Sequence, residues 1–88
     1  MDPHKLNRIR FRAWRRGFRE ADLILGSFAD RHGPSMTDAQ LNQFERLLEQ
    51  EDHDIYAWIL QSAPTPEAFD DDLMARIRAF APPTARGA

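Results

Sequence analysis

The sequence of 88 residues contains no cysteine, no valine and no long apolar run. Without cysteine the chain cannot form a disulfide framework, a thiol nucleophile or a thiolate metal site, and such a composition suits a reducing compartment. The longest unbroken apolar segment, Ile55 to Leu60, has six residues, whereas a helix that crosses a bilayer needs about 20. We therefore expect neither secretion nor a membrane span.

The length and the composition favour one small helical domain. A chain of this size can build one modest core but not two. Residues that favour helices, chiefly alanine, leucine, arginine and glutamate, fill the sequence, and no segment alternates with the period of a strand. We expect a single all-α domain over residues 1–88, with an ordered part at about 5–81 and a flexible tail at 82–88.

Apolar spacing and helix-ending residues predict five helices. Their approximate bounds are Leu6 to Arg15, Phe18 to Arg31, Thr37 to Leu48, Asp52 to Ile59 and Thr65 to Phe80. Short amphipathic helices joined by short loops predict a compact five-helix bundle. Its core is expected to hold the aromatic residues of the apolar faces and the apolar residues of the first helix: Trp14, Phe28, Phe44, Trp58 and Phe69, with Leu6, Ile9 and Phe11.

Particular residues mark the expected helix ends. Gly33 can end the second helix in left-handed backbone, which glycine adopts without a side-chain clash. Thr37 has a glutamine three residues later and so predicts a capping box. Asp52 or Asp54 can cap the fourth helix, and Thr65 can cap the fifth.

The charge is divided between two parts of the chain. Residues 1–20 carry seven basic and two acidic side chains, a net charge of +5, and the rest of the chain carries a net charge of −7. This asymmetry indicates a charged binding surface, although an arginine-rich helix packed against acidic neighbours explains it equally well. A transit peptide would also be rich in arginine, but its removal would take apolar residues from a small core. We treat the segment as part of the mature fold.

Residues that carry catalytic or metal chemistry do not gather in the sequence. The histidines His4, His32 and His53 lie apart and have no second ligand at helical spacing. No serine has histidine and acid partners at informative positions, and no glycine-rich loop precedes a helix to hold phosphate. The acidic run Asp70-Asp71-Asp72 is better explained by the dipole of the fifth helix than by a cation. We expect neither an enzyme nor a metal site.

The segment Trp14-Arg15-Arg16-Gly17-Phe18-Arg19-Glu20 lies where the first helix turns into the second. Gly17 suits a tight bend, and Arg16 could pair with Glu20 along one helix face, which would contribute about 0.3 to 0.5 kcal/mol. The functional interpretation is that a bare glycine beside guanidinium groups and a carboxylate lets the backbone of another protein approach closely. Arginine would then offer a planar fork to a partner carboxylate. From spacing alone both interpretations stay open.

At these residues the sequence resembles the assembly factors of succinate dehydrogenase, the family of bacterial SdhE and mitochondrial succinate dehydrogenase assembly factor 2. Arg16-Gly17-Phe18-Arg19-Glu20 has the form of the family's Arg-Gly-x-x-Glu motif. Three further blocks follow in the family's order and extend the similarity to roughly residues 5–80: Asp22 to Asp30, Phe44 to Glu49 and Asp52 to Ile59. The sequence departs from the family at Gln61-Ser62, where related chains often have glycine.

The resemblance implies a five-helix bundle that binds the flavoprotein subunit of succinate dehydrogenase, and in bacteria that of fumarate reductase. It implies that the bundle promotes covalent attachment of FAD to a histidine of that subunit. Because the chemistry then belongs to the client, we expect no cofactor bound stably by this chain. We expect a monomer in the bacterial cytoplasm rather than in the mitochondrial matrix, because the sequence has no apparent presequence.

The resemblance places the motif residues at the surface that meets the client. They are Arg16, Gly17 and Glu20, with Arg15 and Arg19 beside them. Charge and proximity add Arg8, Arg10, Arg12 and Trp14 to the set. For Trp14 a place in the core is an equal alternative, because tryptophan often buries its ring while its N–H stays near water.

A small helical nucleic-acid-binding protein that uses its basic N-terminal helix is the alternative from another class. The chain has the arginines for it but no recognisable recognition module. Its isoelectric point near 5.8 and its acidic remainder would oppose binding to phosphates. We therefore expect no nucleic-acid partner.

Overall fold

The computed structural model of the protein describes residues 3–81, and within that range it contains helices but no strand. The elements in chain order are α1 (Pro3–Ala13), α2 (Arg19–His32), the 3₁₀ turn η1 (Gly33–Ser35), α3 (Asp38–Leu48), α4 (Asp52–Leu60), the 3₁₀ turn η2 (Glu67–Phe69) and α5 (Asp72–Phe80). The predicted all-α five-helix bundle is confirmed. The tail expected at residues 82–88 lies outside the described residues.

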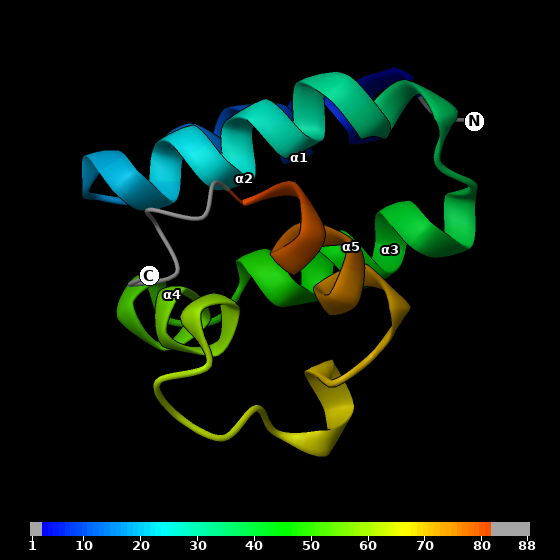
Figure 1. The fold of residues 1–88 in the computed structure, drawn as a ribbon. Helices are drawn as coiled ribbons and strands as arrows, with labels where there is room; N and C mark the ends of the chain where they lie inside the picture. Colours follow the sequence, from blue (N-terminus) through cyan, green and yellow to red (C-terminus); the bar gives the residue numbers. More distant parts are fainter. Residues whose placement is uncertain (1–2, 82–88) are drawn as a thin grey trace.

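Helices α1 and α2 form an antiparallel hairpin along one side of the molecule, with α3, α4 and α5 on the other side (Figure 1). Helix α1 packs on α2 and on α3, while α5 contacts α2, α3 and α4. The last helix therefore closes the core between the hairpin and the rest of the chain.

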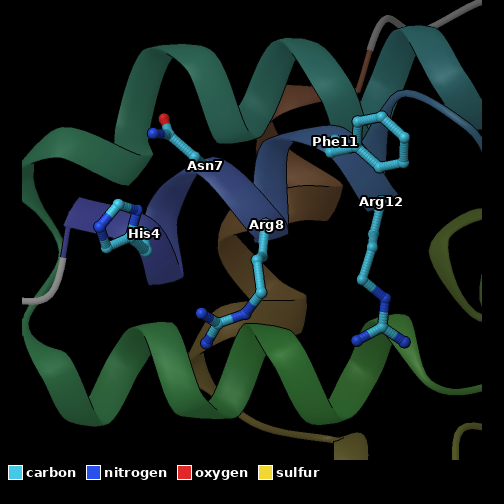
Figure 2. Close-up of a pocket in the computed structure, with 5 residues that line it drawn as sticks. All are labelled: His4, Asn7, Arg8, Phe11 and Arg12. Carbon is cyan, nitrogen blue, oxygen red and sulfur yellow. The ribbon is translucent and has the colours of Figure 1, made fainter.

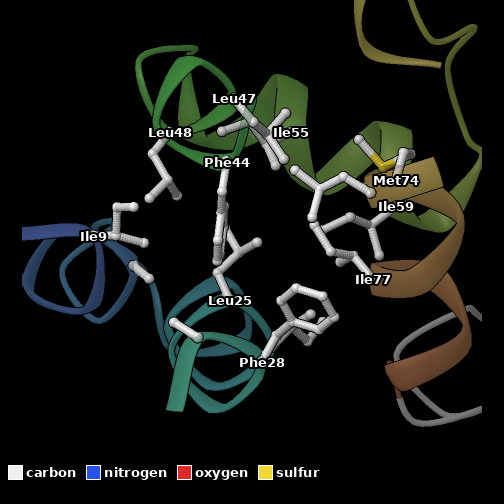
Figure 3. Packing of buried hydrophobic residues seen from close by; sticks show 14 of the residues in the cluster. Ile9, Leu25, Phe28, Phe44, Leu47, Leu48, Ile55, Ile59, Met74 and Ile77 are labelled. Atoms are coloured by element: carbon white, nitrogen blue, oxygen red, sulfur yellow. The ribbon is translucent and has the colours of Figure 1, made fainter. Parts of the chain in front are cut away.

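The core draws buried side chains from all five helices, which converge between the hairpin and helices α3 to α5 (Figure 3). Its largest fully buried members are Ile9, Leu25, Phe28, Leu41, Phe44, Leu47, Leu48, Ile55, Ile59, Met74 and Ile77. Phe28 packs edge to face against Phe44, with ring centroids 5.6 Å apart. Burial of each such side chain contributes about 1.5 to 3 kcal/mol, so this cluster holds the bundle together.

Two aromatic residues are less buried than predicted. Phe69 is only half-buried and stacks on the buried Trp58, with ring centroids 5.5 Å apart, at the edge of the core. Phe11 is 60% exposed, so its assignment to the core is wrong. The inward face of α1 is set by Ile9 and Ala13, which are four residues apart, and Phe11 lies halfway between them on the opposite face.

Gly33 ends α2 with a backbone conformation different from the one predicted. It has a right-handed φ of −53°, because the chain continues directly into the 3₁₀ turn η1. A Cβ at this position would lie 2.6 Å from Cδ1 of Leu6. The glycine is therefore needed for space and not for left-handed backbone.

The predicted capping box at the start of α3 is confirmed. Thr37 Oγ1 accepts a hydrogen bond from Gln40 N at 3.2 Å, and Gln40 Oε1 accepts one from Thr37 N at 2.8 Å. The predicted cap of α4 is wrong, because Glu51 occupies the N-cap position without a side-chain cap bond. Asp52 points its carboxylate at an arginine of the α1–α2 bend instead.

Helix α5 begins later than predicted. Asp71 caps it, since its Oδ1 accepts a hydrogen bond from Met74 N at 3.0 Å. Thr65 Oγ1 accepts instead from Arg78 Nη2 at 2.7 Å, and Arg78 Nε donates to Trp58 O at 3.1 Å. One arginine thus ties the α4–α5 connection to α4, and only a single 3₁₀ turn forms before the aspartate cap.

Candidate functional site

The sharp turn between α1 and α2 depends on Gly17. Its φ is +110°, a backbone conformation that residues with a side chain rarely adopt. The next residue, Phe18, is extended and occupies the N-cap position of α2. The predicted tight bend at Gly17 is therefore confirmed.

Arg16 folds inward beneath this bend. Only 7% of its side chain is exposed. Its Nη2 donates to Asp52 Oδ1 at 2.8 Å and to Gln50 O at 3.0 Å, and its backbone N donates to Asp22 Oδ1 at 2.6 Å. In the described residues it forms no ion pair with Glu20. The guanidinium therefore connects the bend to the start of α4.

Two arginines from this region reach the C-terminal end of α3. Arg12 Nη2 donates to Leu48 O at 3.4 Å, and Arg16 donates to Gln50 O two residues further along the chain. The last carbonyls of a helix lack intrahelical partners, and the negative end of the helix dipole favours a cation there. The buried part of the basic segment thus stabilises the fold.

Asp52 also borders Gly17. A Cβ built on the glycine would lie 3.1 Å from Asp52 Oδ2, which is tighter than an ordinary van der Waals contact. The remaining surface of Gly17 is exposed. The glycine is thus fixed by its backbone conformation and by the neighbouring carboxylate, and it presents bare backbone to the solvent.

Ring contacts hold the other side of the bend to α4. Phe18 stacks on His53 with ring centroids 4.7 Å apart and an interplanar angle of 6°, and it meets Tyr56 edge to face at 5.1 Å. Sequence reasoning missed this support, since nothing local predicts that Phe18 reaches a helix more than 30 residues away.

The predicted residues around the bend divide into exposed and buried ones. Arg15, Gly17, Arg19 and Glu20 are exposed. Within residues 3–81, Arg19 and Glu20 form no ion pair, and the Arg15 guanidinium lies over the Phe11 ring at 4.2 Å from its centroid. The bend therefore offers two cationic groups and one carboxylate beside a bare backbone.

Trp14 and Arg10 are both fixed by Asp30 of α2. Arg10 Nε donates to Asp30 Oδ1 at 2.7 Å, and Trp14 Nε1 donates to Asp30 Oδ2 at 3.1 Å. The indole ring lies on Gly26, where a Cβ would overlap three ring atoms. Trp14 remains 37% exposed. The indole therefore packs one face on α2 at the edge of the fold and leaves the other open to solvent, and its contact with a client stays a prediction.

Arg8 lies on α1 farther from the bend than the other predicted residues. Its Nη2 is 3.5 Å from Glu45 Oε2 of α3. Figure 2 shows Arg8 and Arg12 pointing toward α3 from an open hollow of about 540 Å³ along α1, which is also lined by His4, Asn7 and Phe11. The structure thus does not gather Arg8 with the residues of the bend.

The described part of the chain contains neither a cluster of metal ligands nor a helix that could span a membrane. Within residues 3–81, no group of three or more histidine, aspartate and glutamate side chains is arranged to hold a metal ion. No helix in that range has the length and apolar character needed to cross a membrane. What the arrangement can do is recognise another surface through shape, charge and backbone hydrogen bonds.

The amino-acid sequence matches one protein family over most of its length. Residues 7–81 match the family described as "Flavinator of succinate dehydrogenase". The chain is 37% identical over 71 residues to the mitochondrial succinate dehydrogenase assembly factor 2 of Dictyostelium discoideum, which covers 81% of this chain and 50% of that protein. It is 32% identical over 78 residues to the Danio rerio protein of the same name, with 86% and 49% covered.

The Mycosarcoma maydis protein of that name is 39% identical over 62 residues, which cover 70% of this chain and 26% of the relative. The chain therefore spans about half the length, or less, of these curated relatives.

Proposed function

Since the chain belongs to the succinate dehydrogenase flavinator family, we propose that it binds the flavoprotein subunit of succinate dehydrogenase and promotes covalent attachment of FAD to it. The observation that carries the proposal is the exposed bend at Gly17, in the Arg16-Gly17-Phe18-Arg19-Glu20 segment, with φ at +110° and with the side chains of Arg15, Arg19 and Glu20 open to solvent.

The bend supplies the docking face. At Gly17 no side chain stands between the partner and the backbone, so a partner backbone can approach to hydrogen-bond distance. Arg15 and Arg19 provide guanidinium groups for carboxylates of the client, and Glu20 provides an acceptor for a donor. Each of these three side chains is exposed, so docking requires no rearrangement of the bundle.

Arg16 contributes to the docking face through the shape of the bend. Its guanidinium is occupied by Asp52 Oδ1 and Gln50 O, so it holds Gly17 in place and leaves the forked contacts to its neighbours.

Arg10 and Trp14 extend the proposed face along α1. Arg10 and Trp14 share Asp30, so together they add a neutralised ion pair and an indole surface next to the bend. Arg8 is half-exposed beside Glu45 of α3, so a client that also contacts Arg8 must reach around α1 to its α3 side.

The proposed mechanism is orientation of the client. The factor binds one conformer of the flavoprotein subunit and holds its histidine close to the flavin, so that the bond forms at the client's own site. A factor that bound all conformers equally would not accelerate the reaction. This chain thus needs no cofactor of its own, and the FAD remains with the client.

We extend the proposal to the flavoprotein subunit of fumarate reductase as a second client and to the bacterial cytoplasm as the location. The absence of cysteine suits this reducing compartment, as it would the matrix of the mitochondrion, which the names of the curated relatives give. Cell fractionation of the source organism distinguishes the two locations.

Co-expression tests the proposed function. The flavoprotein subunit is expressed with and without this chain, and covalent flavin is read as fluorescence of the subunit in a denaturing gel. We expect a clear increase in the fluorescence when the chain is present. Equal fluorescence with and without it, at equal flavoprotein levels, contradicts the proposal.

The structure argues against the nucleic-acid alternative, because most arginines of the basic helix already bind acceptors within the protein. Arg8, Arg10, Arg12 and Arg16 all contact protein acceptors, so the helix presents no continuous free stripe for phosphates. Salt-dependent binding to duplex or single-stranded nucleic acid at physiological ionic strength would be required to restore it.

A further inference from the structure

Large apolar side chains are exposed in only one region of the described chain. Within residues 3–81 they are Phe11, Trp14 and Leu23, which are 60%, 37% and 46% exposed. All three belong to the α1–α2 hairpin, on either side of Gly17. Scattered exposed apolar residues are ordinary, but a grouped set on a small domain is typical of an interaction site.

Helical spacing links these residues into one strip: the helical turn continues to Trp14, whose N donates to Arg10 O, so Phe11 and Trp14 are neighbours three residues apart. Trp14 packs on Gly26, which is three residues from Leu23 on α2. Arg10 pairs with Asp30, and Trp14 packs on Gly26, so the α2 residue Leu23 lies nearer to the bend than the Trp14 contact. Leu23 and Asp30 are seven residues apart and share one face of α2. We call Phe11, Trp14 and Leu23 the hairpin strip; it begins next to the exposed residues of the bend.

The strip is held in a fixed geometry. Trp14 is fixed by its hydrogen bond to Asp30 and by the packing of its indole ring against Gly26. Glycine inside a helix is destabilising relative to alanine, and the overlap that a Cβ would make with the indole accounts for its presence. The Arg15 guanidinium covers one face of Phe11. A rigid aromatic surface loses little entropy on binding.

The charges around the hairpin strip indicate what kind of surface binds to it. Arg15 and Arg19 are exposed beside the strip and have no carboxylate partner within residues 3–81. A second copy of this chain, related by a twofold axis, would bring the four arginines of the two copies together with only the two Glu20 carboxylates to oppose them. A surface on another protein that carries apolar residues bordered by carboxylates fits both the strip and the arginines.

We propose that the hairpin strip is a second contact area for the flavoprotein subunit, and that it receives an apolar patch bordered by acidic side chains. The inference rests on the proposed function and extends the docking face from the bend onto Phe11 and Leu23. The strip contributes affinity, because its apolar surface is removed from water when the client binds. The bend contributes the orientation that flavinylation needs.

The test uses the double variant Phe11→Ser and Leu23→Ser in the full chain. Both positions are exposed, so the core is left intact and circular dichroism should be unchanged. The control is Ala39→Ser with Ala75→Ser, two exposed helical positions on α3 and α5. The dissociation constant for the purified flavoprotein subunit is measured by titration calorimetry, and the flavinylation rate is measured against the concentration of the factor.

We expect the double variant to weaken binding by about tenfold or more and to reach the wild-type flavinylation rate at saturation, with the control unchanged. Equal binding by wild type and double variant, while wild type still promotes flavinylation, overturns the inference and leaves the proposed function intact. Failure of the wild type to bind or to promote flavinylation overturns both. A concentration-dependent dimer in sedimentation analysis that the double variant abolishes assigns the strip to a second copy and also overturns the inference.

Discussion

The two ends of helix α2 both carry a glycine, and the two glycines meet different needs. Gly17, before the helix, has a φ of +110° and is exposed beside polar groups. Gly33, after the helix, has a φ of −53° and is buried under Leu6. The first end presents bare backbone to the solvent, where we propose that the partner docks, whereas the second lets η1 and α1 approach each other. A glycine is therefore interpreted from its φ and its neighbours together.

The largest effect is expected from Gly17→Ala. The new Cβ would be strained at φ +110° and would crowd Asp52 Oδ2, so we expect a loss of about 1 to 3 kcal/mol in the free energy of unfolding. We also expect covalent flavin on the client to fall to the level without the factor, while the helical circular dichroism signal persists. A variant that keeps full flavinylation would contradict the role given to the bend, and one that unfolds completely would reduce the bend to a structural turn.

Arg16→Ala is expected to have the next largest effect on stability. It removes the bonds to Gln50 O and to a carboxylate that is itself about one-third exposed, so we expect a loss of about 2 kcal/mol. Arg16→Lys should recover part of it, because an ammonium group can replace the charge but not the planar fork. Urea unfolding provides the measurement. A loss below about 0.5 kcal/mol, the range of an exposed pair, would mean that the buried connection does not form.

Gly33→Ala sharpens the comparison, since it places the same methyl group at the other end of α2. The backbone there is already right-handed, and the clash is with a terminal methyl group of Leu6 that can rotate away. We expect a loss of about 1 kcal/mol at most and unchanged flavinylation per folded molecule. Thermal unfolding and the gel assay are run on both glycine variants in parallel. Loss of flavinylation in Gly33→Ala at full folding would remove the distinction between the two ends.

The smallest effect on stability is expected from the protonation of His32 at the C-terminal end of α2. Burial among aromatic rings lowers the pKa of His32 below its ordinary value of 6.5, and the charges of Arg76 and Arg31 lower it further. The unfolded chain then binds this proton more readily than the folded chain does. Stability should therefore fall as the pH drops below about 6.5 and level off below the folded pKa. The difference between wild type and His32→Gln in urea unfolding at several pH values isolates this contribution, and a difference that does not change with pH would contradict it.

Features with local causes could be predicted from the sequence. The Gly17 bend follows from one residue type between two helical segments, and the Thr37 capping box follows from a spacing of three residues. The predicted place of Phe11 in the core is wrong because apolar character alone does not determine which face of a short helix packs on the core. Only the packing of Ile9 and Ala13 decides it.

The remaining differences arise from contacts between distant segments. Arg16 is buried because it binds Gln50 O and Asp52 Oδ1. These partners lie 34 and 36 residues later in the chain, so no local sequence pattern predicts the contacts. The predicted start of α5 is wrong because Thr65 and Asp71 can both cap a helix. Arg78 engages the hydroxyl of Thr65, and this tertiary contact leaves Asp71 as the cap.

Amide hydrogen exchange of the full chain, alone and bound to the purified flavoprotein subunit, tests the central claim most directly. If the bend at Gly17 is the docking face, binding should slow exchange at residues 15–23 and leave residues 32–36 at the other end of α2 unchanged. Protection that falls on residues 32–36 or on α5, with residues 15–23 exchanging as in the free chain, would contradict the account.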